Sequence, residues 1–181
     1  LTCAVLIQIG TNLLNDAKDG ERGADGPDRI GPLRITGAGL ANPKQVRRAA
    51  LACFVAALIA GIYLVFVGGM PILLIGLASL VSGYAYSSGR RPLSHGPFSE
   101  VYVIVFFGLV AVAGSHYLQS KQLPEGAVLL TGIAIGCYAA AVLLVNNLRD
   151  TAADLRAGRR TLAGRLGTRA TQLLYGFLVL L

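Results

Sequence analysis

The sequence predicts an all-α bundle of transmembrane helices. Its mean hydropathy is +0.62, 54% of its residues are hydrophobic and only 14% are charged, which lies outside the usual range of soluble domains. The charges are also clustered, because the segments 49–89, 101–120 and 126–148 contain no Asp, Glu, Lys or Arg. A membrane-spanning helix needs about 20 consecutive apolar residues. Long uncharged segments separated by charged loops therefore indicate several membrane spans.

Taken in order, the apolar segments predict partial spans at both ends and complete spans between them. The segment 1–15 is typical of the second half of a span, and 170–181 of the first half of another. The segment 49–89 is long enough for two spans, with a break at Val67–Pro71, where two glycines precede a methionine and a proline. Because the chain opens and closes in apolar segments without an initiator Met, we expect one transmembrane domain, 1–181, truncated at both ends. The expected complete spans are 49–66, 71–89, 101–120 and 126–148.

The basic residues predict the orientation of these spans. All of the 16 Lys and Arg residues except Lys121 lie on one side of the membrane. The positive-inside rule makes that side cytoplasmic, as expected for a multi-pass protein of the cell inner (plasma) membrane. Topology thus accounts for the net charge of +7 and the pI of about 9.7, so we expect the lipid bilayer, and no nucleic acid, as a partner.

Two copies of one acidic pattern lie on this side, one of the form N-x-x-x-D-x-x-D and the other N-x-x-x-D-x-x-x-D. At about 100° per residue, each trio falls within an arc of about 60–80° and shares one helix face. Both follow helices expected to run inward, which favours a weak parallel repeat with a site between its halves. Each pattern then opens a long polar loop, 17–43 or 148–168. The two trios are Asn12, Asp16 and Asp19, and Asn146, Asp150 and Asp154.

Carboxylates that converge from two helices are typical ligands of a hard divalent cation, and Mg²⁺ usually completes its shell with substrate phosphates. Because Asp16 and Asp150 are expected at helix C-termini, where the helix dipole disfavours carboxylates, a bound cation or a nearby Lys or Arg would relieve the repulsion. Asn12 and Asn146 either bind the metal or orient the carboxylates; interhelical hydrogen bonding is the alternative for these amides, and interfacial salt bridges for the acids. The predicted catalytic and metal-binding acids are Asp16, Asp19, Asp150 and Asp154.

A diphosphate site also needs cations that neutralise the oxygens of the leaving group. Basic residues in the loops beside both motifs supply them, although each one alone is also compatible with a lipid headgroup contact. Tyr86, near the inner end of a span, either lines an aromatic or carbocation pocket through its ring quadrupole or anchors the helix at the interface. The predicted substrate-binding cations are Lys18, Arg22, Arg29, Arg34, Arg91, Arg149 and Arg159.

These residues resemble the UbiA superfamily of intramembrane prenyltransferases. The segment Arg29–Arg34 is most similar to the branch that prenylates 1,4-dihydroxy-2-naphthoate in menaquinone or phylloquinone synthesis. Two stretches depart from the family pattern: Arg159-Arg160 stands where a Lys usually follows Gly, and Ser94–Pro97 differs in the third cytoplasmic loop. The resemblance is carried by Gln8–Asp16, Arg22–Asp25, Arg29–Arg34, Glu100–Gly108, Gly114–Gln119 and Asn146–Gly167.

The resemblance implies a nine-helix fold around a central cavity, of which this chain would hold the second helix through the start of the seventh. It implies that Mg²⁺ held by the four acids binds a polyprenyl diphosphate, with Asp25 among the substrate-binding residues. Metal and basic residues would then stabilise the departing diphosphate. The aromatic ring would attack the resulting allylic cation and lose its carboxyl group as CO₂, giving a demethylmenaquinone-type product.

Three alternatives remain open. One is a UbiA-type enzyme that uses another aromatic acceptor, such as 4-hydroxybenzoate or homogentisate. The CDP-alcohol phosphotransferases also place Asp clusters on membrane helices, but they need the acids in one segment with a D-x-x-D-G signature. A cation or organic-anion transporter with acids at a repeat interface would place those acids near the middle of the membrane rather than at its cytoplasmic edge.

Cysteine labelling tests the predicted orientation. In a variant whose three native cysteines are replaced, Ala38→Cys should react with an impermeant maleimide only from the cytoplasmic side. Gln122→Cys, on the opposite side of the span count, should react only from outside. The physical reason is the concentration of Lys and Arg on one side. Labelling of both positions from the same side would contradict the span assignment.

Overall fold

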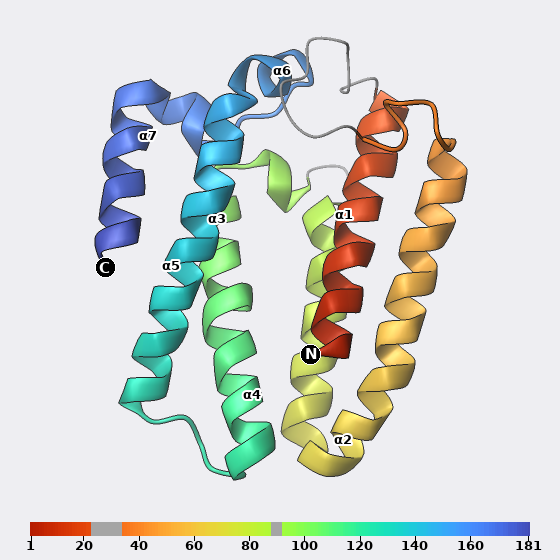
Figure 1. Cartoon of the computed structure of the whole chain (residues 1–181), viewed down its shortest axis with the longest axis vertical. Coiled ribbons are helices and arrows are strands. Elements are labelled where there is room, and N and C mark those ends of the chain that lie inside the picture. Colours follow the sequence, from red (N-terminus) through yellow and green to blue (C-terminus); the bar gives the residue numbers. More distant parts are fainter. Residues whose placement is uncertain (23–33, 88–91) are drawn as a thin grey trace. The chain divides into compact units, whose positions relative to one another are not determined.

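The computed structural model describes residues 1–22, 34–87 and 92–181, and within these ranges its regular elements are all helical (Figure 1). Three helical segments are long and apolar enough to cross a membrane: Pro43–Ser87, Ser99–Ser120 and Gly126–Arg149. The predicted class, an all-α bundle of membrane helices, is confirmed. The chain divides into two compact units, Leu1–Ser94 and His95–Leu181, and each is described by itself.

The first unit consists of helices α1 (Thr2–Arg22) and α2 (Pro43–Ser87). Helix α2 is broken at Gly69, whose φ of 69° and ψ of −158° are not helical, and Pro71 follows two residues later. Glycine tolerates this backbone conformation because it has no Cβ. Figure 1 shows the two arms of α2 folded back beside each other. The expected span 49–66 falls on the first arm and residues 71–87 of the expected span 71–89 fall on the second, while residues 88 and 89 lie outside the described residues.

Helix α1 packs against both arms of α2 through small residues. A Cβ built at Gly10 would lie 3.1 Å from the ring of Phe54 on the first arm, and one at Gly83 on the second arm would lie 3.0 Å from Oγ1 of Thr11. The hydroxyl of Ser87 donates a 3.4 Å hydrogen bond to the carbonyl of Thr11. Such close approach is usual for membrane helices, where small residues let backbones come together.

Helix α1 is longer than the sequence predicted. The polar loop was expected to begin at residue 17, but α1 continues to Arg22. Lys18 and Glu21, three residues apart on the helix, form a 3.2 Å ion pair, which is a stabilising arrangement on a helix surface. The first acidic motif therefore lies within regular helix along its whole length.

The second unit is built around a helical hairpin. Its first arm is α3 (Ser99–Val103), the π-helical segment η2 (Ile104–Val110) and α4 (Ala111–Ser120); its second arm is α5 (Gly126–Arg149). Lys121, with a φ of 60°, ends the first arm in a left-handed conformation. Two shorter helices follow, α6 (Thr151–Arg156) and α7 (Leu162–Leu180). The 3₁₀ turn Leu93–His95 lies at the boundary between the units.

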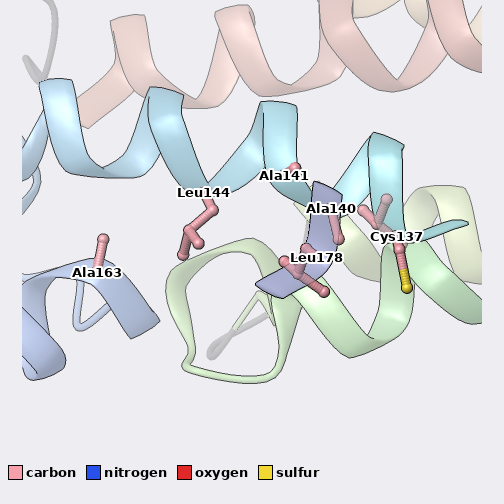
Figure 2. Packing of buried hydrophobic residues seen from close by; sticks show 7 residues of the cluster. Cys137, Ala140, Ala141, Leu144, Ala163 and Leu178 are labelled. Atoms are coloured by element: carbon pink, nitrogen blue, oxygen red, sulfur yellow. The ribbon is translucent and has the colours of Figure 1, made fainter. Parts of the chain in front are cut away.

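The hairpin arms meet at glycines. A Cβ built at Gly108 in η2 would lie only 2.2 Å from the carbonyl oxygen of Gly132, and one at Gly136 would lie 2.7 Å from the carbonyl oxygen of Ile104. No side chain fits at these distances. Alongside this contact, α3, α5 and α7 form the buried core of the unit (Figure 2), which comprises Val103, Cys137, Ala140, Ala141, Leu144, Ala163 and Leu178.

Many large apolar side chains point outward from the helices. Phe66 is 85% exposed and Leu130 is 68% exposed. Exposed apolar area on this scale is expected where a protein contacts lipid or another apolar partner rather than water. The helices therefore present many of their large apolar side chains outward, whereas the acidic residues Asp16, Asp19, Glu100 and Asp154 are buried.

Candidate functional site

The first acidic motif lies on α1. Asp16 and Asp19 are buried, at 5% and 1% exposure, whereas Asn12 is exposed. Because α1 ends at Arg22, Asp19 is in the last helical turn and Asp16 precedes it by about one turn. The expectation that Asp16 lies at a helix C-terminus is therefore wrong, and since the helix dipole acts mainly within the last turn, its unfavourable effect falls on Asp19.

Asp16 is held by the chain segment that leads into α2. Its Oδ2 accepts a 2.9 Å hydrogen bond from the amide of Ile35, and its Oδ1 accepts a 3.1 Å bond from the amide of Thr36. The hydroxyl of Thr36 also donates to Oδ1 and lies 3.1 Å from the main-chain carbonyl of Asp16. Two adjacent residues thus engage both oxygens of one carboxylate.

Asp19 is compensated by a cation instead. Nη2 of Arg34 lies 3.2 Å from Oδ2 of Asp19, and the Asp19 side chain is almost fully buried in this pair. Breaking a buried ion pair by removing one partner typically costs about 3–5 kcal/mol. Lys18, predicted to bind substrate, pairs with Glu21, which also contacts Arg47 at 3.2 Å. Arg34 therefore lies directly beside the first motif, while Lys18 is engaged on the helix surface.

The second motif spans the junction of α5 and α6. Helix α5 ends at Arg149, and Asp150 caps it with φ of −92° and ψ of 7°. The amide of Asp150 nevertheless donates to the carbonyl of Asn146 at 3.0 Å, and the amide of Asp154 donates to the carbonyl of Asp150 at 2.9 Å. These hydrogen bonds, each to the residue four positions earlier, continue the helical pattern through the junction, so the three motif residues lie near one face.

Both acids of the second motif have arginine partners. Arg149 binds Asp150 in a bidentate arrangement, with Nε to Oδ1 and Nη2 to Oδ2 both at 2.8 Å, a strong geometry for a guanidinium and a carboxylate. Arg159 lies 3.3 Å from Oδ1 of the buried Asp154 through its Nη1. Its main-chain amide donates to the carbonyl of Asp154 at 2.8 Å, and burial lowers the pKa of the Arg159 guanidinium.

A further carboxylate lies against the second motif. Glu100 in α3 is 3% exposed; its Oε1 accepts a 2.9 Å hydrogen bond from the side-chain amide of Asn147, and its Oε2 accepts a 3.0 Å bond from Ser99. Asn147 is the neighbour of the motif residue Asn146. Sequence reasoning did not select this pair, although an acid at the start of an uncharged span was a usable signal.

Three of the other predicted residues, Asp25, Arg29 and Arg91, lie outside the described residues, and so does the side chain of Arg22. Tyr86 is half-buried near the end of α2. Within the described parts of the chain, the side chains of Asn12 and Asn146 form no hydrogen bond.

The donor set fits a hard cation. Carboxylate and amide oxygens are the ligands that Mg²⁺ prefers, and each motif supplies two carboxylates and one amide from its own unit. Within residues 1–22, 34–87 and 92–181, no group of three or more His, Cys, Asp or Glu side chains gathers at one point. Each unit therefore offers half of the expected set of acids, next to arginines suited to an anionic group.

Each unit thus carries one acidic motif in which at least one acid has an arginine partner, in a chain with three helical segments long and apolar enough to cross a membrane. The model of the UbiA prenyltransferase family matches residues 1–181, and the chain belongs to this family. The resemblance predicted from the sequence is confirmed.

Within this comparison, the chain is similar to several individual proteins with named activities. The chain is 38% identical to the 1,4-dihydroxy-2-naphthoate octaprenyltransferase of Mycobacterium tuberculosis, over 97% of this chain and 59% of that protein. It is 39% identical to the Escherichia coli protein of the same name, over 92% of this chain and 56% of the relative. The 2-carboxy-1,4-naphthoquinone phytyltransferase of Synechocystis is 29% identical over 53% of this chain and 31% of its own length. The chain thus spans little more than half the length of the first two relatives. No solved structure gives a significant match.

The contact between Glu100 and Asn147 can be tested by charge exchange. Asn147→Asp should lower the midpoint of thermal unfolding in detergent, because it places two buried carboxylates at hydrogen-bond distance. Adding Glu100→Gln should recover most of the loss, since the exchanged pair again joins one amide to one carboxylate. A coupling of about 0.5–3 kcal/mol is expected for residues in contact. Additive losses in the double variant would show that the two side chains do not interact.

Proposed function

We propose that the protein transfers a polyprenyl group from a polyprenyl diphosphate to 1,4-dihydroxy-2-naphthoate, with loss of CO₂. The observation that carries the proposal is the similarity to naphthoate octaprenyltransferases along nearly the whole chain, combined with two acidic motifs that are each flanked by arginine. The motifs alone support diphosphate chemistry. The similarity to the relatives, together with the segment Arg29–Arg34, supports the naphthoate acceptor.

In this proposal the acids hold the metal and the arginines hold the leaving group. Asp16, Asp19, Asp150 and Asp154 would bind Mg²⁺, and when bound it supplies positive charge to the diphosphate oxygens. Arg34, Arg149 and Arg159 lie next to these acids and would donate hydrogen bonds to the same anion. Charge-assisted donors of this kind stabilise the negative charge that grows on the leaving oxygen.

With the acids assigned to the metal and the arginines to the diphosphate, the bond changes of the reaction can be written out. The C1–O bond of the donor breaks, and its electron pair leaves with the diphosphate. The allylic carbon, now electron-deficient, accepts electrons from the aromatic ring to form the new C–C bond. The carboxylate departs as CO₂, and its bonding electrons restore the aromatic ring, so no added oxidant or reductant is needed. Exclusion of water from the apolar surroundings protects the allylic cation from hydrolysis.

The place of the reaction is also part of the proposal. The isoprenoid donor is a lipid, and the outward-facing apolar side chains of the helices suit a bilayer. The crowding of Lys and Arg on the side that carries both motifs favours an active site that faces the cytoplasm, in the inner membrane.

An acceptor assay tests the proposed reaction. Membranes that contain the full-length protein, given Mg²⁺ and a polyprenyl diphosphate, should convert carboxyl-labelled 1,4-dihydroxy-2-naphthoate into a prenylated product and labelled CO₂. The values of kcat/KM for 4-hydroxybenzoate and homogentisate should be at least about 100-fold lower, which corresponds to about 2.7 kcal/mol of discrimination. A preference for either of these acceptors would overturn the naphthoate assignment.

Metal removal and acid substitution test the diphosphate site. EDTA should stop product formation and excess Mg²⁺ should restore it. Asp150→Ala should lower kcat/KM by at least about 100-fold, because it removes a proposed ligand and leaves Arg149 without its bidentate partner. Glu21→Gln is the matched control, since Glu21 lies outside the motif on the exposed surface of α1, and it should stay within about threefold of the parent. Normal turnover by Asp150→Ala would contradict the assignment of the metal site.

A further inference from the structure

We infer that Thr36 is a positioning residue for Asp16: its hydroxyl, with the adjacent main-chain amides, fixes the carboxylate so that one oxygen faces a metal. This inference rests on the proposed function, in which Asp16 is a metal ligand. Thr36 lies outside both acidic motifs, 20 residues after Asp16 in the sequence. It belongs to the turn of chain that leads into α2.

The hydrogen bonds leave the two oxygens of Asp16 unequal. Oδ1 accepts from both the amide and the hydroxyl of Thr36, whereas within the part of the chain that the structure describes Oδ2 accepts from the amide of Ile35 alone. A carboxylate offers about four acceptor positions, two on each oxygen. With the single hydroxyl proton of Thr36 donated to Oδ1 rather than to the main-chain carbonyl, Oδ1 is saturated and Oδ2 retains one position. The geometry therefore points to coordination through Oδ2 alone, with the orientation of the carboxylate set before a metal arrives.

The position of Thr36 is itself fixed by packing. A Cβ built at Gly20 would lie 2.6 Å from Oγ1 of Thr36 and 2.7 Å from its Cβ. Because glycine has no Cβ, Gly20 lets Thr36 approach α1 this closely, about one turn beyond Asp16. The threonine hydroxyl also lies within hydrogen-bond distance of the main-chain carbonyl of Asp16. Because a β-branched side chain has few χ1 rotamers, these contacts determine where its hydroxyl points.

Asp16 differs from the other three acids in the kind of partner that its carboxylate has. Asp19, Asp150 and Asp154 each have an arginine partner. Asp16 is satisfied by neutral donors, and among the described residues it forms no ion pair. Neutral donors orient a carboxylate without cancelling its charge, so Asp16 keeps its attraction for a cation. Partners of this kind behind a metal ligand typically change metal affinity by about 10–100-fold.

The test compares threonine variants of the full-length protein by metal affinity. Mn²⁺ is titrated by electron paramagnetic resonance in the presence of farnesyl thiolodiphosphate, a donor analogue that does not react. Thr36→Val, which keeps the shape and removes the hydroxyl, should weaken Mn²⁺ binding at least about 10-fold. Thr36→Ser, which keeps the hydroxyl, should stay within about threefold of the parent. The Mg²⁺ concentration for half-maximal prenyl transfer should shift in parallel, with the KM for the donor at saturating Mg²⁺ little changed.

Two further variants supply a control and a second test. Thr131→Val removes a hydroxyl that bonds only within α5 and should leave the Mn²⁺ titration unchanged. Gly20→Ala should displace Thr36 and weaken binding as Thr36→Val does. If Thr36→Val fails to fold, as judged by gel filtration in detergent, Thr36→Ala replaces it, because alanine adds no bulk at the contact.

The outcomes separate this inference from the proposed function. Parent-like Mn²⁺ affinity in folded Thr36→Val, or equal losses in Thr36→Ser and Thr36→Val, would overturn the positioning role of the hydroxyl. If the parent binds Mn²⁺ and shows the predicted order of variants but does not prenylate the naphthoate, the role of Thr36 stands and the acceptor is wrong. If the parent binds no Mn²⁺ with the analogue present, the metal assignment and the role of Thr36 both fail.

Discussion

The burial of carboxylates at the ends of apolar helices is the constraint on which the rest of the structure depends. A buried carboxylate is costly unless it receives hydrogen bonds or an opposite charge. Segments that follow each motif provide these partners. Residues 34–36 contact Asp16 and Asp19 on α1, and Arg159 contacts Asp154. The polar segments after the motifs are therefore part of the motifs' own stabilisation.

Close helix packing is the second requirement, because lipid provides little hydrophobic drive for helices to associate. Contacts such as Gly108 with the carbonyl of Gly132 and Gly10 with the carbonyl of Ala50 bring main chains together where a larger residue would not fit. In the second unit this packing places α3 beside α5, where Glu100 meets Asn147. The two arms of the hairpin are thus held together at two places. Glycine contacts hold them along their apolar length, and the contact between Glu100 and Asn147 holds them near the second motif.

From local pattern the sequence predicted the apolar helices and the break in α2, but it misplaced the end of α1 and missed the contacts between distant residues. Apolar length and the Gly-Gly-Met-Pro break predicted the membrane helices and the discontinuity now seen at Gly69. The end of α1 was misplaced because the polar run after Asp16 was interpreted as a loop, whereas it continues as helix with Lys18 and Glu21 paired. Thr36 and Glu100 were not selected as site residues, since their partners lie 20 and 47 residues away, far beyond helical periodicity.

Charge balance explains why arginines beside the acids suit the proposed reaction. Without substrate, pairs such as Arg34 with Asp19 and Arg159 with Asp154 leave neither charge uncompensated. In the proposed reaction, a metal–diphosphate complex would bring a cation for the acids and an anion for the arginines. Each pair would then exchange its internal partner for a partner on the complex, so that neither buried charge would lose its counter-charge. Donation from the arginines to the diphosphate would be strongest as negative charge grows on the leaving oxygen, so the same exchange would favour departure over simple binding.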